Sequence, residues 1–165
     1  MNKTLIAYFS CTNTTRRLAE ALAQVAGGDL YRIVPAVPYT AADLDWHDDN
    51  SRSSVEMRDP NARTAIAGEP LNMASYDVIY LGSPIWWGLP PTVVNTFLES
   101  HSFTGRTIIP FVTSGSSPVG ETDQQLRSSS PAADWRPATR FAADTTADQL
   151  RRWAQTFTGG GDKWT

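Results

Sequence analysis

The sequence predicts an α/β protein built on an open, doubly wound parallel sheet. Short, nearly continuous apolar runs alternate along the chain with segments whose apolar residues recur at helical spacing. Such runs are typical of strands that are buried on both faces of a parallel sheet. A polar loop rich in Ser, Thr or Gly follows three of the runs. Because ligands of open α/β sheets bind beyond the carboxyl ends of the strands, the pattern also predicts a binding site at one edge of the sheet.

The first unit is a strand, a polar loop, a helix and a second strand. Residues 4–9 form a short apolar run, and residues 10–15 form the polar loop. The apolar residues that then recur at helical spacing are Leu18, Ala21, Leu22 and Val25. Gly27 and Gly28 supply the helix stop, and residues 30–34 are expected to be the next strand. This order predicts a right-handed crossover.

Residues 35–75, which we call the excursion, interrupt the alternation. The excursion is rich in Pro, Asp, Asn, Ser and Arg and carries only scattered apolar residues. Residues 51–58 are expected to form a short helix that the following Asp59-Pro60 pair ends. Because loops of this length are usually functional or mobile, we interpret the excursion as a surface segment that covers one edge of the site.

The alternation resumes with an expected strand at residues 78–81 and a helix that begins near Pro90-Pro91. Residues 107–112 are the next strand. Pro110 lies inside it and argues against a central position unless a bulge spares the missing hydrogen bond. A fifth strand is expected at residues 140–142. The last helix presents one apolar face, made of Leu150, Trp153, Ala154 and Phe157.

The composition predicts one soluble, cytoplasmic domain spanning residues 1–165, with a flexible tail at residues 159–165. The net charge of −3 offers no basic field for nucleic acid or anionic lipid, so neither is an expected partner. The single cysteine, Cys11, excludes an internal disulfide and a cysteine-built metal site. No apolar run approaches the roughly 18 residues of a membrane span. The apolar part of the N-terminus is too short for a signal-peptide core.

The acidic cluster around Trp46 is interpreted as solvated loop charge, and no metal site is predicted. Its members are Asp43, Asp45, His47, Asp48 and Asp49. Cys11 is interpreted as a small buried filler. Because the spacing shows no nucleophile beside a base, no catalytic residue is predicted either.

The loop at residues 10–15 carries four hydroxyls and an amide where a strand meets a helix N-terminus. Free backbone N–H groups and the helix dipole favour an anion there. The loop lacks both the G-x-x-x-x-G-K-[ST] and the G-x-G-x-x-G pattern, so it suits a phosphate monoester that is held and not cleaved. N-capping and a polar turn remain the alternative, and they would account for one or two of these residues.

The second loop places Trp86 and Trp87 directly after a buried strand. Tryptophans at the mouth of a sheet are costly to expose unless they cover something flat, and core packing is the alternative for one of the pair. The third loop, residues 113–117, offers small hydroxyls and closely approaching backbone.

Together the three loops resemble the flavodoxin-like FMN-binding family, in its branch with a P-I-W-W-G loop. The motifs are Y-F-S-C-T-N-T-T at residues 8–15, G-S-P-I-W-W-G at residues 82–88 and P-F-V-T-S-G-S at residues 110–116. The resemblance implies a three-layer sandwich around a five-stranded parallel sheet of order 2-1-3-4-5. The excursion and the Gly-rich tail are the least covered by it.

The resemblance also implies an FMN site. Residues matching the S-x-T-G-N-T loop would bind the 5′-phosphate, and they are Ser10, Thr12, Asn13, Thr14 and Thr15. Residues that would flank the isoalloxazine are Ser83, Pro84, Ile85, Trp86, Trp87 and Gly88, with Trp86 as the stacking ring. Residues along its other edge would be Thr113, Ser114, Gly115 and Ser116. Asn13 stands where the family usually has Gly, and Asn tolerates the left-handed conformation better than most residues.

The function implied by this resemblance is FMN-dependent redox chemistry. One hypothesis is a low-potential, flavodoxin-type electron carrier whose redox partner is unknown. The alternative is an NAD(P)H-dependent FMN oxidoreductase that acts on quinones or similar acceptors. A carrier is expected to show a strongly acidic docking face, which a net charge of −3 supports only weakly.

Overall fold

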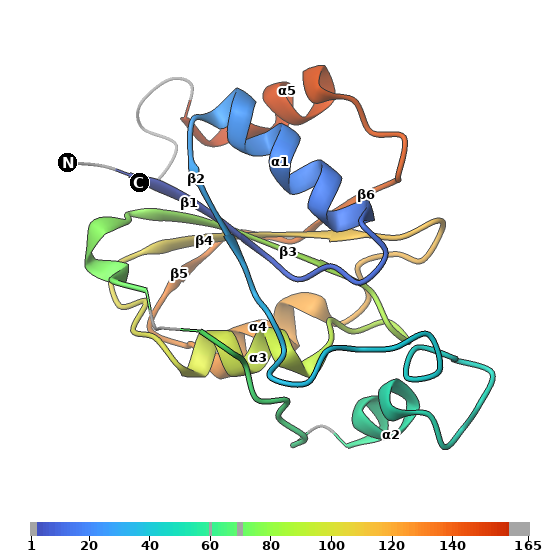
Figure 1. The fold of residues 1–165 in the computed structure, drawn as a ribbon. Helices are drawn as coiled ribbons and strands as arrows, with labels where there is room; N and C mark the ends of the chain where they lie inside the picture. The colour runs from blue at the N-terminus through green and yellow to red at the C-terminus, as the bar shows by residue number, and fades with distance from the viewer. Residues whose placement is uncertain (1–2, 60, 69–70, 159–165) are drawn as a thin grey trace.

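The computed structural model describes residues 3–59, 61–68 and 71–158. Figure 1 shows a parallel sheet with α1 and α5 on one face and α3 and α4 on the other. The strands are β1 (Thr4–Tyr8), β2 (Asp29–Arg32), β3 (Val78–Pro84), β4 (Thr107–Thr113), β5 (Asp134–Trp135) and β6 (Thr139–Phe141). The helices are α1 (Thr14–Ala26), α2 (Arg52–Arg58), the short η1 (Met73–Ser75), α3 (Thr92–Glu99), α4 (Thr122–Ser129) and α5 (Ala147–Thr158).

The predicted fold class and strand order are confirmed. The sheet runs β2-β1-β3-β4-β5, and every pair of neighbouring strands is parallel. Gly27 ends α1 at φ 73°, the left-handed conformation that a glycine C-cap provides. The tail predicted at residues 159–165 lies outside the described residues.

Alternating residues of the buried strands pack against opposite helix layers, which explains their continuous apolar runs. Leu5 and Ile79 belong to the cluster on the α3 side, where Phe97 is fully buried. Ile6 and Tyr80 belong to the cluster on the side of α1 and α5. Because successive side chains of a strand point to opposite faces, both faces of β1 and β3 must be apolar.

The fifth position of the sheet consists of two short strands instead of one. β5 pairs with Thr107 and Ile108 at the start of β4, and β6 pairs with the end of β4. The strand expected at residues 140–142 corresponds to β6, one residue earlier. The break between β5 and β6 lies opposite Pro110, whose missing N–H makes an interruption of the neighbouring ladder tolerable.

Helix α4 was not predicted. Its sequence, TDQQLRSS, contains one apolar residue, Leu126, which is buried. Its position depends on polar contacts with α3. Asn95, only 1% exposed, donates to the Gln125 carbonyl (3.3 Å) and to Ser129 Oγ (2.7 Å), while Gln125 Nε2 donates to Asn95 Oδ1 (2.8 Å). Tertiary hydrogen bonds therefore compensate for the weak apolar pattern of this helix.

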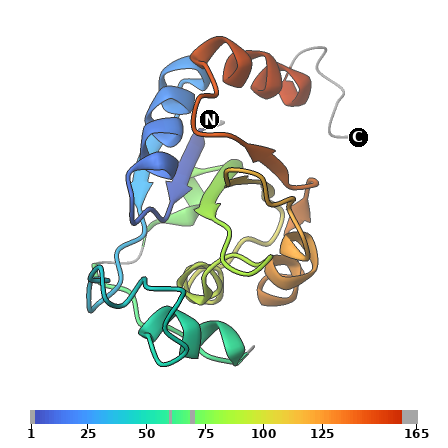
Figure 2. The same cartoon turned by 90° about the vertical axis from the view of Figure 1, so that its right-hand side faces the viewer.

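The excursion is closed at its base by a short antiparallel pairing, which we call the neck (residues 34–36 and 65–67). The Ala36 N–H donates to the Ala65 carbonyl (2.8 Å), and the Ala67 N–H donates to the Val34 carbonyl (2.7 Å). Figure 2 shows the excursion, coloured cyan to green, on the α3 side of the molecule and away from α1 and α5. The neck therefore holds the two ends of residues 37–64 together.

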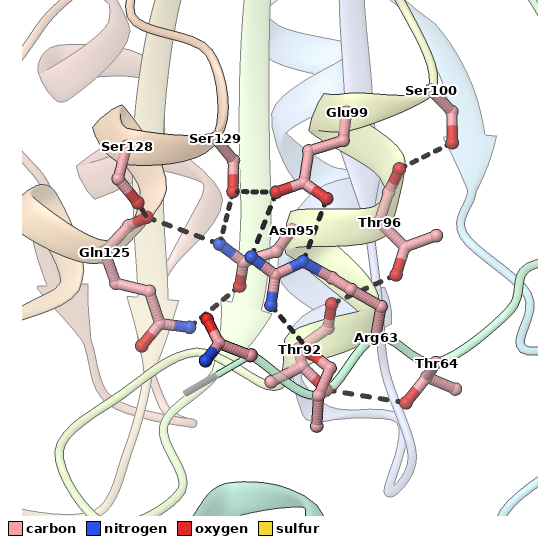
Figure 3. Close-up of polar contacts among 12 residues, drawn as sticks. Arg63, Thr64, Thr92, Asn95, Thr96, Glu99, Ser100, Gln125, Ser128 and Ser129 are labelled. Atoms are coloured by element: carbon pink, nitrogen blue, oxygen red, sulfur yellow. Dashed lines mark hydrogen bonds and ion pairs between the residues drawn. The ribbon is translucent and has the colours of Figure 1, made fainter. Parts of the chain in front are cut away.

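Arg63 fixes the returning limb of the excursion to α3. Its guanidinium donates to both carboxylate oxygens of Glu99, at 2.9 and 3.0 Å, and Ser129 Oγ donates to the same carboxylate at 2.9 Å (Figure 3). These donors, Arg63 first, hold the pKa of Glu99 below its usual value. The bidentate geometry makes this contact more specific than an ordinary surface ion pair.

The buried Tyr80 hydroxyl has no hydrogen-bond partner among the residues described by the structure. Tyr80 is 1% exposed, its oxygen has no hydrogen bond, and burial raises its pKa to about 12. Because an unsatisfied buried hydroxyl costs about 1–3 kcal/mol, Tyr80→Phe is expected to leave the free energy of unfolding unchanged or higher. Urea unfolding of the wild type and the variant measures this free energy. A decrease of more than about 1 kcal/mol in Tyr80→Phe would show that the hydroxyl has a partner.

Candidate functional site

A pocket of about 540 Å³ lies at the carboxyl ends of β1, β3 and β4, where the three predicted loops meet. The predicted site residues that line it are Thr12, Thr15, Pro84, Ile85, Trp86, Trp87 and Thr113. Ser10 lines a neighbouring cavity of about 300 Å³, and Cys11 lines both. The other predicted residues belong to the same loops but do not line the larger pocket, and they are Asn13, Thr14, Ser83, Gly88, Ser114, Gly115 and Ser116.

The first loop ends in an α1 N-terminus that no side chain caps. Asn13 occupies the N-cap position at φ 69°, in the left-handed region that favours glycine. The first turn of α1 contains no acidic residue. Backbone N–H groups at this helix start therefore remain available for an anion.

Ser10 adds an unsatisfied donor to this loop. The residue is 5% exposed, and its Oγ has no hydrogen-bond partner in the described part of the chain. Its carbonyl oxygen accepts a hydrogen bond from Arg32 at 3.2 Å, which places a guanidinium beside the loop. Buried hydroxyls are almost always paired, so a lone one beside an uncapped helix start indicates a position made for a ligand.

The first and third loops are joined through two hydroxyls. Thr15 Oγ1 and Thr113 Oγ1 lie 2.8 Å apart, and both residues are buried. Arg140 supports the third loop from outside, donating to Ser114 Oγ at 2.9 Å and to the carbonyls of Ser114 and Gly115 at 3.0 and 2.5 Å. No sequence pattern indicates this role of Arg140, since it depends on the position of β6.

The second loop is a tight turn with both central residues at positive φ. The N–H and C=O groups of Trp86 and Leu89 bond to each other at 2.7 and 3.1 Å, while Trp87 and Gly88 have φ values of 52° and 79°. Two positive values in succession are the signature of a type I′ turn. Glycine adopts this conformation freely, but a bulky residue such as Trp87 adopts it only under strain.

This turn separates the two tryptophans. Trp86 contacts Phe9 and Tyr39 edge-on, with ring centroids 6.0 and 5.5 Å apart. Trp87 is 53% exposed, although it also lines the pocket. Trp86 therefore packs inward, as in the core-packing alternative for one of the pair, and Trp87 presents an uncovered ring to the pocket. The stacking role that the resemblance implies for Trp86 stays a prediction.

The structure adds five pocket residues that the sequence did not assign to the site. They are Cys11, Leu44, Trp46, Ser53 and Ser117. Leu44, Trp46 and Ser53 come from the excursion, so the excursion forms a wall of the pocket. The sequence signal that could have assigned Trp46 to the site is its position, as a large aromatic residue, within a run of acidic residues.

Cys11 is a neutral thiol in this environment. Burial raises its pKa to about 11, against the opposing influence of the Arg32 and Arg52 guanidinium groups. Because the thiolate is the nucleophile, Cys11 is unreactive at neutral pH. Its partial burial between two cavities agrees with the filler role predicted for it.

Among residues 3–59, 61–68 and 71–158, no group of three or more His, Cys, Asp or Glu side chains is arranged to hold a metal ion. Over the same ranges, no helix is long and apolar enough to cross a membrane.

The strand order and the edge pocket define a flavodoxin-like α/β protein, and comparison with known proteins gives the family. The sequence matches the family described as Flavodoxin over residues 3–157. The chain therefore belongs to the flavodoxin family, which confirms the resemblance. No curated protein matches it.

Solved structures agree with this assignment. A protein of Bacteroides eggerthii designated a flavoprotein is 46% identical, with 94% of this chain and 98% of that chain covered and a TM-score of 0.86. A similarly designated protein of Bacteroides uniformis is 45% identical, with 93% and 98% covered and a TM-score of 0.89. A flavoprotein of Lactobacillus acidophilus in complex with FMN shares the fold at 20% identity, with 85% and 93% covered and a TM-score of 0.66.

Proposed function

We propose that this protein binds FMN in the pocket and serves as a low-potential electron-transfer protein. The observation that carries the proposal is the first loop, which contains both an uncapped helix start and the Ser10 hydroxyl, unpartnered among the described residues. The family and the FMN complex of the Lactobacillus acidophilus flavoprotein support the choice of ligand.

The residues present fit the phosphate of FMN. Ser10, Thr12, Thr14 and Thr15 offer hydroxyl donors, and Asn13 holds the backbone turn that leads into α1. Hydrogen bonds to a charged group contribute about 1.5–3 kcal/mol each, more than bonds between neutral groups. In this proposal the loop binds the phosphate through neutral donors and does not cleave it.

The other two loops would enclose the ring of FMN. Residues 83–88 would form one wall, and residues 113–116 would lie along the other edge. Bound FMN supplies the redox chemistry, since it accepts and releases electrons. The protein's part is to orient the ring and exclude water from it. Trp86 and Trp87 would cover the ring, and the Thr15–Thr113 hydroxyl pair would fix the spacing of two loops.

The alternative is an NAD(P)H-dependent FMN oxidoreductase acting on quinones or similar acceptors. The observation that favours it is the wall formed by the excursion, because Trp46 and Leu44 extend the pocket beyond the three loops. An enzyme needs such room for a second reactant, whereas a carrier needs an accessible edge for a protein partner.

An anaerobic titration of the FMN-loaded protein tests both functions. A carrier is expected to be reduced by dithionite in separate one-electron steps and only slowly by NADPH. Rapid reduction by NADPH, with turnover of a quinone, would instead establish the enzyme. A protein that retains no FMN after reconstitution and gel filtration would contradict both functions.

A further inference from the structure

The excursion contributes a buried hydroxyl to the pocket that has no hydrogen-bond partner among the residues that the structure describes. Ser53, in α2, lines the pocket, is 2% exposed, and its Oγ makes no hydrogen bond. Its backbone N–H donates to the Asp43 carbonyl at 3.0 Å, so the backbone is held in place. A buried hydroxyl without a bond is a cost to the folded protein that an alanine would avoid.

Neighbouring serines show that the Ser53 hydroxyl is not needed to form α2. Ser51 is the N-cap residue and accepts a hydrogen bond from the Ser54 N–H at 3.3 Å. The hydroxyl of Ser51 donates to the hydroxyl of Ser54 at 2.9 Å. Two of the three serines therefore satisfy each other, and the third, Ser53, faces the pocket without a structural role for its oxygen.

Trp46 adds an aromatic surface to the same wall. The side chain is 64% exposed, and its ring lies on His47 with centroids 3.7 Å apart. Trp87, 53% exposed, lines the same pocket from the second loop. Large aromatic rings are costly to leave in water, and two of them at one pocket indicate a flat ligand.

The contacts of Tyr39 place this wall beside the second loop. The Tyr39 hydroxyl donates to Glu56 at 2.5 Å, and the Arg52 guanidinium lies 3.8 Å from the centre of the Tyr39 ring. Tyr39 also meets Trp86 edge-on at 5.5 Å. Since Arg52 and Glu56 are both in α2, the helix is fastened to the loop that lines the pocket.

We propose that Ser53 and Trp46 form a subsite for a flat ring that carries a carbonyl oxygen. Ser53 donates a hydrogen bond to that oxygen, and Trp46 covers a face of the ring. A rotation about the single side-chain bond of Ser53 brings the hydroxyl to the ligand without breaking any hydrogen bond. The proposal rests on the function proposed above, under which the ring belongs either to FMN itself or to a separate quinone acceptor.

Ser53→Ala and its matched control Ser54→Ala test the subsite in the full chain. Ser53→Ala is expected to leave the FMN-free protein as resistant to urea as wild type, or more so, and to weaken ring binding roughly five- to tenfold. Ser54→Ala is expected to make the FMN-free protein less resistant to urea and to leave ring binding unchanged, since it removes a bonded hydroxyl outside the pocket. Trp46→Ala is expected to weaken ring binding by a similar factor, with Val55→Ala, an exposed residue of α2, as its control.

Two ligands distinguish the source of the ring. FMN is titrated into the FMN-free protein by quenching of flavin fluorescence, and menadione into the FMN-loaded protein by equilibrium dialysis. Weaker FMN binding in Ser53→Ala and Trp46→Ala assigns the subsite to the flavin ring, and weaker menadione binding alone assigns it to the acceptor. Unchanged affinities for both ligands in both variants would overturn the subsite.

The same experiment separates this proposal from the proposed function. If wild-type protein binds no FMN, the proposed function fails, and menadione is titrated into the FMN-free protein instead. Weaker menadione binding in Ser53→Ala than in Ser54→Ala would then still support the subsite. Equal binding in these two variants, or no binding to wild type, would overturn it.

Discussion

Replacing Ser10 and Thr12 together by alanine is expected to weaken FMN binding about a hundredfold or more, while riboflavin binding changes little. Each hydroxyl that donates to a charged phosphate contributes about 1.5–3 kcal/mol, and riboflavin has no phosphate to lose. The FMN-free protein should unfold at nearly the wild-type urea concentration, because Ser10 Oγ is unpartnered and Thr12 is exposed. Quenching of flavin fluorescence measures both affinities.

Ser100→Ala is a suitable control for that pair. The Ser100 hydroxyl donates to the Thr96 carbonyl at 2.6 Å at the far end of α3, so its removal should leave both flavin affinities unchanged. Equal losses for FMN and riboflavin in the double variant would mean that the first loop holds no phosphate.

Gly120→Ala is expected to have the largest effect on stability among the loop glycines. Gly120 has φ 59°, and a Cβ there would lie 2.3 Å from the carbonyl oxygen of Gly88. The conformation alone costs about 1–3 kcal/mol for a residue other than glycine, and the clash with rigid backbone adds to it. Because the Glu121 N–H also bonds to the Gly88 carbonyl, at 3.2 Å, the second loop should separate from the segment that leads into α4, and FMN affinity should fall.

Gly105→Ala separates the cost of the backbone conformation from the cost of the clash with the Gly88 carbonyl. Gly105 has φ 76°, but a Cβ there would meet nothing within 4 Å, so it reports the conformational cost alone. Urea unfolding of both variants gives the difference due to the contact with Gly88. Equal destabilisation of Gly120→Ala and Gly105→Ala would contradict a close approach of the Gly120 and Gly88 backbones.

The sheet could be predicted from the sequence because its signals are local. The apolar runs of β1, β3 and β4 reflect burial on both faces, and Gly27 marks the end of α1 by its conformation. The edge of the sheet was harder to predict from the sequence. The short β5 strand contains only one charged and one aromatic residue, so it shows no alternation of apolar and polar residues. Helix α4 depends on hydrogen bonds to Asn95, which no pattern within its own sequence encodes.

The candidate site was predictable only where it follows the strands. The loops after β1, β3 and β4 must meet at one edge in a parallel sheet, which placed Thr12, Trp86 and Thr113 near each other before the structure was known. The excursion was expected to cover one edge of the site, and it does, but the sequence did not indicate which of its residues line the pocket. Ser53 lies at the pocket because the contacts of Tyr39 with Glu56 and Trp86 hold α2 beside the second loop, and no local pattern distinguishes it from Ser51 and Ser54.

The neck makes the excursion a candidate for loop exchange. Its two limbs meet through the Ala36–Ala65 and Ala67–Val34 hydrogen bonds, so the ends of residues 37–64 are held together by the protein itself. Doubling the length of a flexible loop with fixed ends costs only about 0.6 kcal/mol in closure entropy. Segments of different length and composition can therefore be grafted between the limbs with little effect on the sheet. Exchanging this segment would rebuild one wall of the pocket and leave the sheet and its three loops in place.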